Sequence, residues 1–285
     1  MTASPATPGG AGPASDGAGP APDGAGRPAE LRGRTALVTG AGNGLGRAIS
    51  LALAAAGVRV LLTGRRADAL HETAGLVARV TGAPAARVAT VDVADERSVA
   101  ALAAELADET VSVLVNNAGV PGPVAPLTEI GVDDWDDVFA VNVRGVFLVC
   151  RAFLPAMVRR GWGDVINLAS VSGKRPLAGR TPYCASKTAV IGLSTTLAAE
   201  VGPLGVTVNT LSPGPVRGPR MERNFRLEAE RTGRTVEAAE AEFAGRALLH
   251  RLVEEDEVGR AVVAMLSMPG LHAADIDLSA GMVAR

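Results

Sequence analysis

The stretch TALVTGAGNGLGRA at residues 35–48 joins a strand pattern directly to a helix pattern, and it decides how the chain folds. Residues 35–40 are apolar and β-branched, as in a buried strand, and the Ala/Leu-rich residues 46–57 predict a helix ending at a glycine. The turn carries the pattern Thr39-Gly40-x3-Gly44-x-Gly46. Such glycines let the backbone approach a phosphate, to which the helix N-terminus presents N–H groups. We expect a phosphate-binding turn, with tight packing as the alternative, formed by Gly40, Asn43, Gly44, Leu45 and Gly46.

Outward from this turn, strand and helix patterns alternate along the rest of the chain. Continuous Val/Ile/Leu strands separated by helices favour a parallel sheet covered on both faces. The prediction is a single-domain, Rossmann-like, doubly wound α/β fold of about seven strands, with ligands at the carboxyl ends of the strands. Strands are expected at 35–40, 58–64, 86–93, 111–119, 163–170, 206–214 and 274–281. Helices are expected at 46–57, 67–80, 95–108, 135–161, 182–202 and 254–267.

Composition excludes several classes of partner. The formal net charge is −2, so the chain has no overall field that would draw it to nucleic acid or anionic lipid. No uninterrupted apolar run reaches the ~18 residues of a membrane span. Cys150 and Cys184 are the only cysteines in 285 residues, which favours reduced thiols in the cytoplasm over a disulfide framework. The three histidines lie far apart, so we expect no metal site.

Residues 1–30 differ in composition from the rest. They are rich in Ala, Gly and Pro, with no basic start or hydrophobic segment of the kind found in secretory signals. Such a segment buries too little apolar surface to offset its ordering entropy. We expect a disordered tail, with a tether as the alternative, and a nucleotide-binding domain over residues 31–285.

The end of the second strand indicates which cofactor is used. NAD-binding domains usually place an acidic residue there for the ribose 2′-hydroxyl. This chain has Gly64 followed by Arg65 and Arg66, and guanidinium groups suit a 2′-phosphate. We therefore favour NADP(H) over NAD(H). The alternative is that these arginines are exposed charges at a helix start, and Asn43 stands where a second basic residue could support NADP.

Tyr183 and Lys187 form the most informative pair of side chains. Tyr183 is the only tyrosine, and Lys187 is one of two lysines. Residues four apart lie on one helix face, so the ammonium can stand beside the phenol. A phenol ionises near pH 10 in water, and a nearby positive charge favours the phenolate. The pair suits proton transfer to a carbonyl oxygen; a helix-surface pair without function is the alternative.

Further motifs follow in a fixed order. They are Asp92-Val93, Asn116-Asn117-Ala118-Gly119, Asn142, Ser170, Tyr183-x3-Lys187 and Pro213-Gly214, after the turn at 39–46. With these motifs, residues 31–285 resemble the short-chain dehydrogenase/reductase family of the compact, single-domain kind, and are similar to 3-oxoacyl-carrier-protein reductases. One departure is the segment 270–285, which lacks the Thr-Gly-Gln common in relatives; only local packing and subunit contacts are put in doubt.

The resemblance implies an oxidoreductase that transfers hydride between nicotinamide and a carbonyl or secondary alcohol. Tyr183 would be the proton donor, Ser170 would bind the substrate oxygen, Lys187 would contact the nicotinamide ribose, and Asn142 would serve a water-linked proton relay. Cofactor contacts would come from Asp92 and Val93 at the adenine, from Asn117, Ala118 and Gly119 at the adenosine, and from Pro213, Gly214 and Val216 at the nicotinamide. A homo-oligomer, either a dimer or a tetramer, is expected.

Three alternative functions remain open at this point. The first is an NAD-dependent alcohol or sugar dehydrogenase of the same fold. The second is a non-catalytic nucleotide sensor, which retention of Asn142, Ser170, Tyr183 and Lys187 disfavours. The third is an enoyl reductase, whose Tyr-to-Lys spacing is wider.

The substrate side is expected to be covered by a helical lid over about residues 215–252. Arg217, Arg220, Arg223 and Arg226 recur there at every third residue, and a second basic cluster occupies residues 173–180. Together they could hold an anionic or carrier-bound substrate. The alternative is a solvated helix with ion pairs Glu222–Arg226 and Arg226–Glu230.

Overall fold

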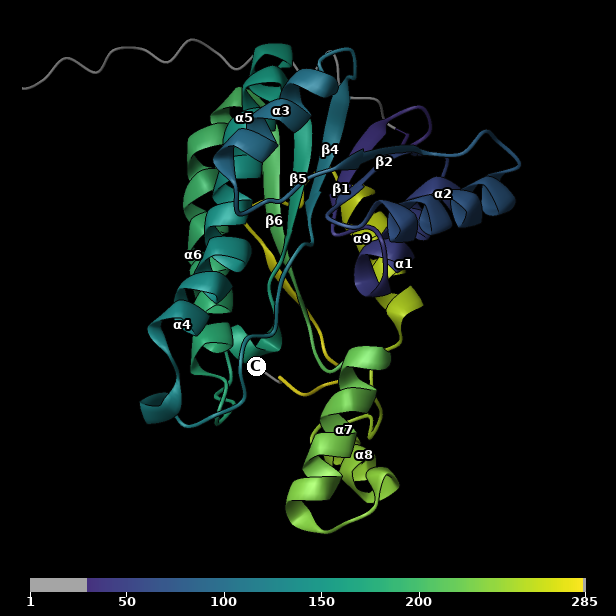
Figure 1. The fold of residues 1–285 in the computed structure, drawn as a ribbon. Helices are drawn as coiled ribbons and strands as arrows, with labels where there is room; N and C mark the ends of the chain where they lie inside the picture. The colour runs from purple at the N-terminus through teal and green to yellow at the C-terminus, as the bar shows by residue number, and fades with distance from the viewer. Residues whose placement is uncertain (1–29, 284–285) are drawn as a thin grey trace, which may run out of the picture.

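The computed structural model describes residues 30–283. The tail expected at residues 1–30 therefore lies outside the described residues, except for residue 30. Seven parallel strands form one sheet in the order β3-β2-β1-β4-β5-β6-β7, which confirms the doubly wound fold (Figure 1). The strands are β1 Thr35–Thr39, β2 Arg59–Gly64, β3 Arg87–Thr90, β4 Val111–Asn116, β5 Gly163–Leu168, β6 Val206–Pro213 and β7 Asp275–Leu278.

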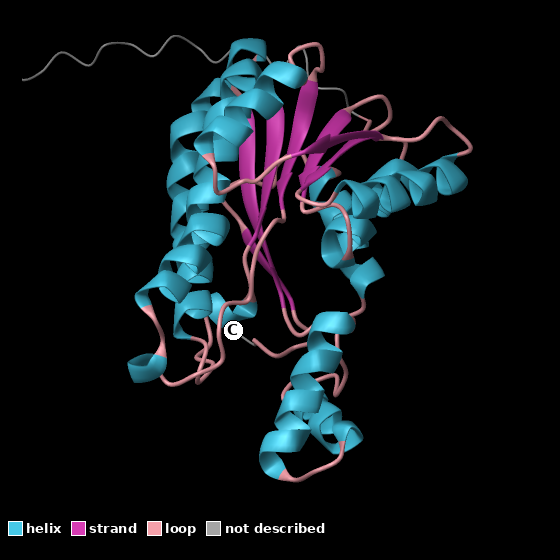
Figure 2. Ribbon diagram, in the orientation of Figure 1, coloured by secondary structure: helices cyan, strands magenta, loops and turns pink. Residues whose placement is uncertain are grey.

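Helices cover both faces of the sheet (Figures 1 and 2). One apolar cluster packs the sheet against α3 Glu96–Glu105, α5 Gly145–Arg160 and α6 Thr181–Val201. A second packs its other face against α1 Gly44–Ala55, α2 Ala67–Thr81 and α9 Glu255–Leu266. Because β1 has β2 on one side and β4 on the other, the chain reverses direction across the sheet at this point. Such a switch point opens a crevice at the carboxyl ends of the strands.

Three strands end three residues earlier than the sequence predicts. One is β7, which was expected at 274–281 and stops at Leu278; the other two are β3 and β4. Patterns at 86–93 and 111–119 predict strands through Val93 and Gly119, but β3 stops at Thr90 and β4 at Asn116. The chain beyond each of these two strands leaves the ladder and forms hydrogen bonds with side chains around the crevice. The residues that were predicted as strand after Thr90 and after Asn116 therefore belong to loops at the crevice.

The helix expected at 135–161 is longer than predicted and is interrupted. It begins at α4 Val132–Phe139, passes through a π turn at Ala140–Arg144, and continues as α5. By length and composition the whole segment could cross a membrane, and half of its most apolar window is buried. Phe153, Leu154 and Met157 are buried in the cluster against the sheet. This segment is therefore a core helix of the fold.

The expected lid forms two helices, α7 Pro219–Thr232 and α8 Val236–Gly245, which project beyond the carboxyl ends of the strands (Figure 1). They enclose a small apolar cluster of their own in which Phe225 and Phe243 have ring centroids 5.5 Å apart. A single bridge between Val216 and Val253 joins the two chain segments that lead into and out of the lid.

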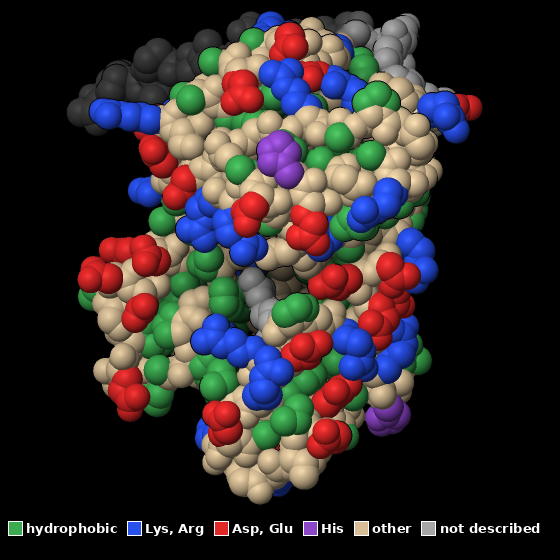
Figure 3. Space-filling model, turned by 45° about the vertical axis from the view of Figure 1, so that its right-hand side comes forward, with side chains coloured by type: hydrophobic (Ala, Val, Ile, Leu, Met, Phe, Trp, Pro, Cys, Tyr) green, Lys and Arg blue, Asp and Glu red, His purple; other side chains and the backbone are tan. Residues whose placement is uncertain are grey.

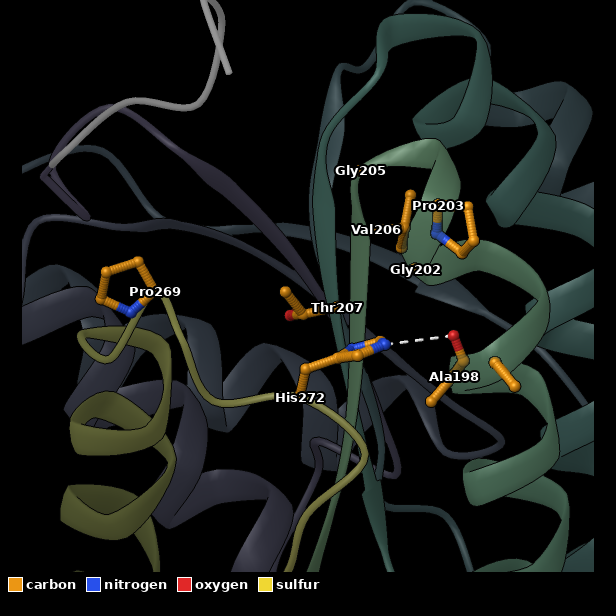
Figure 4. Close-up of a pocket in the computed structure, with 9 residues that line it drawn as sticks. Ala198, Gly202, Pro203, Gly205, Val206, Thr207, Pro269 and His272 are labelled. Atoms are coloured by element: carbon orange, nitrogen blue, oxygen red, sulfur yellow. Dashed lines mark hydrogen bonds between the residues drawn. The ribbon is translucent and has the colours of Figure 1, made fainter. Parts of the chain in front are cut away.

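A pocket of about 410 Å³ lies at the opposite end of the sheet, beside the start of β6 (Figure 4). His272 fixes its wall: Nδ1 accepts from the Val208 N–H at 3.3 Å, so Nε2 carries the proton and donates to the Ala198 carbonyl at 3.1 Å. None of the residues predicted for catalysis or cofactor binding lines this pocket.

Candidate active site

The glycine turn is shaped by close backbone contacts. Gly40 and Gly44 have φ of +67° and +51°, a region that favours glycine. A Cβ built on Gly46 would lie 2.1 Å from the Gly40 carbonyl oxygen, so no other residue fits there. Asn43 occupies the N-cap of α1 with an extended backbone, and its side chain makes no capping hydrogen bond. The N-terminal N–H groups of α1 therefore lack that cap, which fits a dinucleotide pyrophosphate.

Hydrogen bonds between Thr39 and the loop after β4 hold that loop against the glycine turn. The Thr39 Oγ1 accepts from the N–H groups of Asn117 and Ala118, both at 3.0 Å. The Asn117 Nδ2 donates to the Thr39 carbonyl at 2.9 Å. The Asn117 amide thus binds the glycine turn, and Thr39, which our sequence-based site omitted, positions the loop. The only signal for Thr39 in the sequence is its place at the end of the first strand pattern, directly before Gly40.

The loop after β3 reaches the same crevice. The Asp92 Oδ1 accepts from the Ala94 N–H at 3.0 Å, and the Asp92 N–H donates to the Ser98 Oγ at 3.0 Å. Val93 is buried, and a Cβ built on Gly145 would lie 2.9 Å from its Cγ2. Asp92 and Val93 are therefore fixed by their own turn and by the first residue of α5.

The end of β2 lies beside the glycine turn without a carboxylate. A Cβ built on Gly64 would lie 3.7 Å from the Gly40 Cα. Arg65 and Arg66 follow directly, and both are exposed. Two exposed arginines therefore directly follow Gly64, the residue of β2 that lies beside the turn.

Tyr183 and Lys187 lie on the first turns of α6. The Lys187 Nζ is 5.8 Å from the centroid of the Tyr183 ring, and it donates to the Leu168 carbonyl at 2.8 Å. Lys187 is 5% exposed, so its charge acts in a largely water-free setting. The spacing of four residues thus places the ammonium beside the phenol, as predicted.

Ser170 lies just beyond β5, which ends two residues before it. It caps the short 3₁₀ helix η3 Val171–Gly173, and its Oγ accepts from the Ser172 N–H at 3.1 Å. The hydroxyl hydrogen remains available for a substrate oxygen.

The π turn brings Asn142 to the same place. Its Oδ1 accepts from the Val120 N–H at 2.8 Å, and its Nδ2 donates to the Val120 carbonyl and the Ser186 Oγ, both at 3.0 Å. Ser186 in turn donates to the Tyr183 carbonyl at 2.8 Å. Asn142, which is 1% exposed, therefore links the loop after β4 to the helix that carries Tyr183. Our sequence-based site omitted Ser186, although it directly precedes Lys187.

Gly119 keeps this region open. A Cβ built on it would lie 3.1 Å from the Asn142 Oδ1 and 3.6 Å from the Lys187 Nζ. On the far side, the Gly214 N–H donates to the Leu278 carbonyl at 2.8 Å, which ties the end of β6 to β7. Pro213 is thus the last residue of β6, and Gly214 and Val216 follow it at this edge of the sheet.

Several cations of the two basic clusters are engaged by the protein. Lys174 forms ion pairs with Asp275 at 2.7 Å and with Asp277. Arg217 pairs with Glu240 at 2.6 Å and with Glu254 at 3.1 Å. These contacts support the structural interpretation of Lys174 and Arg217 over an anion site.

Arg180 joins three segments around the mouth. It donates to the Pro121 carbonyl at 3.3 Å and to the Asn224 Oδ1 on α7 at 3.1 Å. Figure 3 shows a hollow between the lid, at the bottom, and the body above it. Arg180 is thus a contact between the lid and the loop that precedes Tyr183.

Comparisons with known proteins show which family the sequence and the fold resemble. The short chain dehydrogenase family matches residues 34–230. The chain is 42% identical over 180 residues to the D-threitol dehydrogenase of Mycolicibacterium smegmatis, covering 62% of this chain and 68% of that protein. Its fold matches a single-substitution variant of the actinorhodin polyketide ketoreductase with NADPH, with a TM-score of 0.81, 34% identity, and coverage of 87% and 97% of the two chains. It also matches an NAD+-bound xylitol dehydrogenase, with a TM-score of 0.80, 29% identity, and coverage of 87% and 98%.

The family match spans more than half of the chain, and it includes the glycine turn, the loop after β4 and the start of α6. The residues at these three places are held together at one edge of the sheet. The protein therefore belongs to the short-chain dehydrogenase family of nicotinamide-dependent oxidoreductases that act on alcohols and carbonyl compounds.

Proposed function

We propose that the protein is an NADP-dependent oxidoreductase that interconverts a carbonyl compound and a secondary alcohol, with Tyr183 as the proton donor and acceptor. The main observation is the arrangement of Tyr183 and Lys187, with the buried ammonium 5.8 Å from the centre of the phenol ring. Ser170 and Asn142 lie on the strand-end loop and the π turn that flank this pair. We further infer a cytoplasmic location and a homo-oligomer; exposure of the Phe147 side chain on α5 supports only the oligomer.

In the direction of reduction, a nicotinamide cofactor bound at this site would supply the hydride for the carbonyl carbon. The Ser170 hydroxyl donates a hydrogen bond to the carbonyl oxygen and orients it. Tyr183 gives its phenolic proton to the same oxygen as negative charge develops there. The Lys187 ammonium stabilises the resulting phenolate, and Asn142 holds the backbone of Val120 where water can return the proton.

The preference for NADP rests on the end of β2. Gly64 provides no carboxylate for a ribose 2′-hydroxyl, and Arg65 and Arg66 are exposed beside the glycine turn. Arginine forks suit phosphate oxygens. A second candidate is an NAD-dependent polyol dehydrogenase, which is favoured by the likeness to a D-threitol dehydrogenase and to an NAD+-bound xylitol dehydrogenase.

The experiment is a substrate panel followed at the nicotinamide absorbance. Ketones and 3-oxoacyl thioesters are tested with NADPH and NADH in parallel, and polyols with NADP+ and NAD+ in parallel. NADPH should give the higher kcat/KM. Arg65→Ala should lower kcat/KM for NADPH by about tenfold and leave that for NADH unchanged. Arg79→Ala, at the exposed far end of α2, is the matched control. Faster turnover with NADH would favour the second candidate.

The role of Tyr183 is tested separately. Tyr183→Phe should lower kcat by at least about 100-fold while the Kd for the cofactor stays near that of the wild type. A variant that retains turnover would show that another group supplies the proton.

A further inference from the structure

One carboxylate lies where three helices begin. Glu255 is the first residue of α9, and its side chain reaches the starts of α1 and α7. A Cβ built on Gly218, the N-cap of α7, would lie 2.7 Å from the Glu255 Oε1. One built on Gly44, the first residue of α1, would lie 3.6 Å from the same oxygen. Gly218 therefore leaves the space that this carboxylate uses, and Gly44 lies within contact range of it.

The setting of Glu255 is partly shielded from water. The side chain is half-buried, and burial raises the pKa of Glu255; the positive charge of Arg47 lowers it in part, and Glu254 raises it further. Arg47 faces it from α1 but is hydrogen-bonded to the Gly42 carbonyl at 2.8 Å and paired with Glu72. Nearby cations are thus engaged by other groups.

The lid side contributes one more charged group. Arg217 directly precedes Gly218, and it is held by Glu254 and Glu240. Burial and Glu254 outweigh Arg47, which alone among the charges around Glu255 lowers the pKa of its carboxyl group.

The same N-terminus of α1 is the expected site of the cofactor pyrophosphate. The pyrophosphate and the carboxylate would then both lie at the start of α1. Neighbouring like charges favour protonation of the group that can accept a proton, which here is the carboxylate.

We propose that Glu255 sets the affinity for the dinucleotide: it acts as an internal anion at the glycine turn, and it takes up a proton from solvent when the pyrophosphate binds. The inference rests on the proposed function only in that the dinucleotide binds at this turn. The only chemical change is that the Glu255 carboxylate takes up one proton and becomes a carboxylic acid.

The sign of the pH dependence follows. In the free protein the pKa of Glu255 lies above its ordinary value of 4.5. The proposal requires the pKa to lie higher still in the complex, because a second anion is then nearby. Between these two values, binding carries a proton with it. Affinity is therefore greatest at low pH and falls as pH rises through this window, until the carboxylate is ionised in both states.

The test measures the Kd for NADH by nicotinamide fluorescence between about pH 5.5 and about pH 8.5, and proton uptake by calorimetry in two buffers of different ionisation enthalpy. NADH is used because it has no 2′-phosphate whose own ionisation could produce the signal. The wild type should take up protons and bind more weakly as pH rises. Glu255→Gln should bind about three- to tenfold more tightly at pH 8, with no pH dependence and no uptake.

The chain offers a matched control on the same helix turn. Asp256→Asn also removes one negative charge near the start of α9, but Asp256 is two-thirds exposed and pairs with Arg260 at 2.9 Å. It should behave as the wild type. Equal tightening by both variants would mean that net charge alone is responsible, which would overturn the proposal.

A second variant keeps the test decisive if Glu255→Gln does not fold. Glu255→Pro also removes the carboxylate, and proline is favoured at the first position of a helix. Glu254 has the extended backbone (φ −91°, ψ 152°) that a following proline requires. If neither variant binds NADH more tightly than the wild type at pH 8, the inference fails. If the wild type binds neither NADH nor NADPH, the proposed function fails as well.

Discussion

At the scale of single residues, the two cysteines occupy contrasting sites. Cys150 on α5 is 4% exposed, and the Asn116 Nδ2 lies 3.3 Å from its Sγ. The same Nδ2 donates to the Asn167 Oδ1 at 2.8 Å. Burial raises the pKa of Cys150 to about 12, and the Asn116 hydrogen bond opposes this only in part. Cys184, next to Tyr183 in sequence, is only partly buried, and its pKa is also raised by burial.

Thiol labelling should separate the two cysteines. In the native protein at about pH 8, one thiol at most should react with iodoacetamide, and peptide mass analysis should place it at Cys184. Its rate should rise with pH because more thiolate forms. Cys150 should react only after unfolding in urea, and Cys184→Ser should abolish native labelling. Modification of Cys150 in the folded protein would contradict the buried site.

Residues that act through local spacing could be predicted from the sequence, and residues that act through distant contacts could not. Tyr183 and Lys187 share a helix face because they are four residues apart, and the structure places them together. Thr39 acts on backbone groups 78 and 79 residues away, and Ser186 accepts from Asn142 across 44 residues. No local pattern contains such pairings, so both were absent from our sequence-based site.

At the scale of elements, the sequence predicts most helices and strands to within a few residues. The wrong strand ends and the unpredicted π turn lie around the crevice. The π turn at Ala140–Arg144 was not predicted, because most of its sequence, AVNVR, is compatible with an ordinary helix. Asn142 alone was a signal, as a weak helix former inside an apolar helix. Its three hydrogen bonds to Val120 and Ser186 are tertiary contacts, and they compensate for the irregular backbone.

The lid gives the prediction at this scale. Arg180 contacts Asn224 of α7 and the Pro121 carbonyl, so it restrains the lid over the mouth. Arg180→Ala and Asn224→Ala should each raise KM for the substrate by about three- to tenfold, with a smaller change in kcat, and the double variant should be less than additive. Hydrogen exchange of α7 should become faster in each.

Arg226→Ala is the control for the lid variants, because Arg226 is exposed on the same helix. It should leave KM and exchange near the wild-type values. If Arg180→Ala changes neither quantity, the contact does not restrain the lid.

At the scale of the whole molecule, the two ends of the sheet have different roles. The carboxyl ends of the strands carry the glycine turn, the Tyr183 site and the lid, whereas the amino ends carry a buried ion pair. Arg34 and Asp164 pair there, each 3% exposed. Arg34 also donates to the Ser112 carbonyl at 2.9 Å, and Thr207 donates to Asp164 at 2.5 Å. The start of four neighbouring strands is thus tied together far from the chemistry.

This separation predicts that the ion pair affects stability without affecting catalysis. Arg34→Ala leaves the Asp164 carboxylate buried without its cation, and should lower the free energy of unfolding by about 3–5 kcal/mol. Replacing both partners, as in Arg34→Met with Asp164→Leu, removes the uncompensated charge and should recover most of that loss. Urea unfolding measures the free energy, and kcat/KM at a temperature well below the transition should equal that of the wild type. A double variant as unstable as Arg34→Ala would mean that Arg34 stabilises the sheet through the Ser112 carbonyl and the Trp162 ring, 5.6 Å away, rather than through the charge of Asp164.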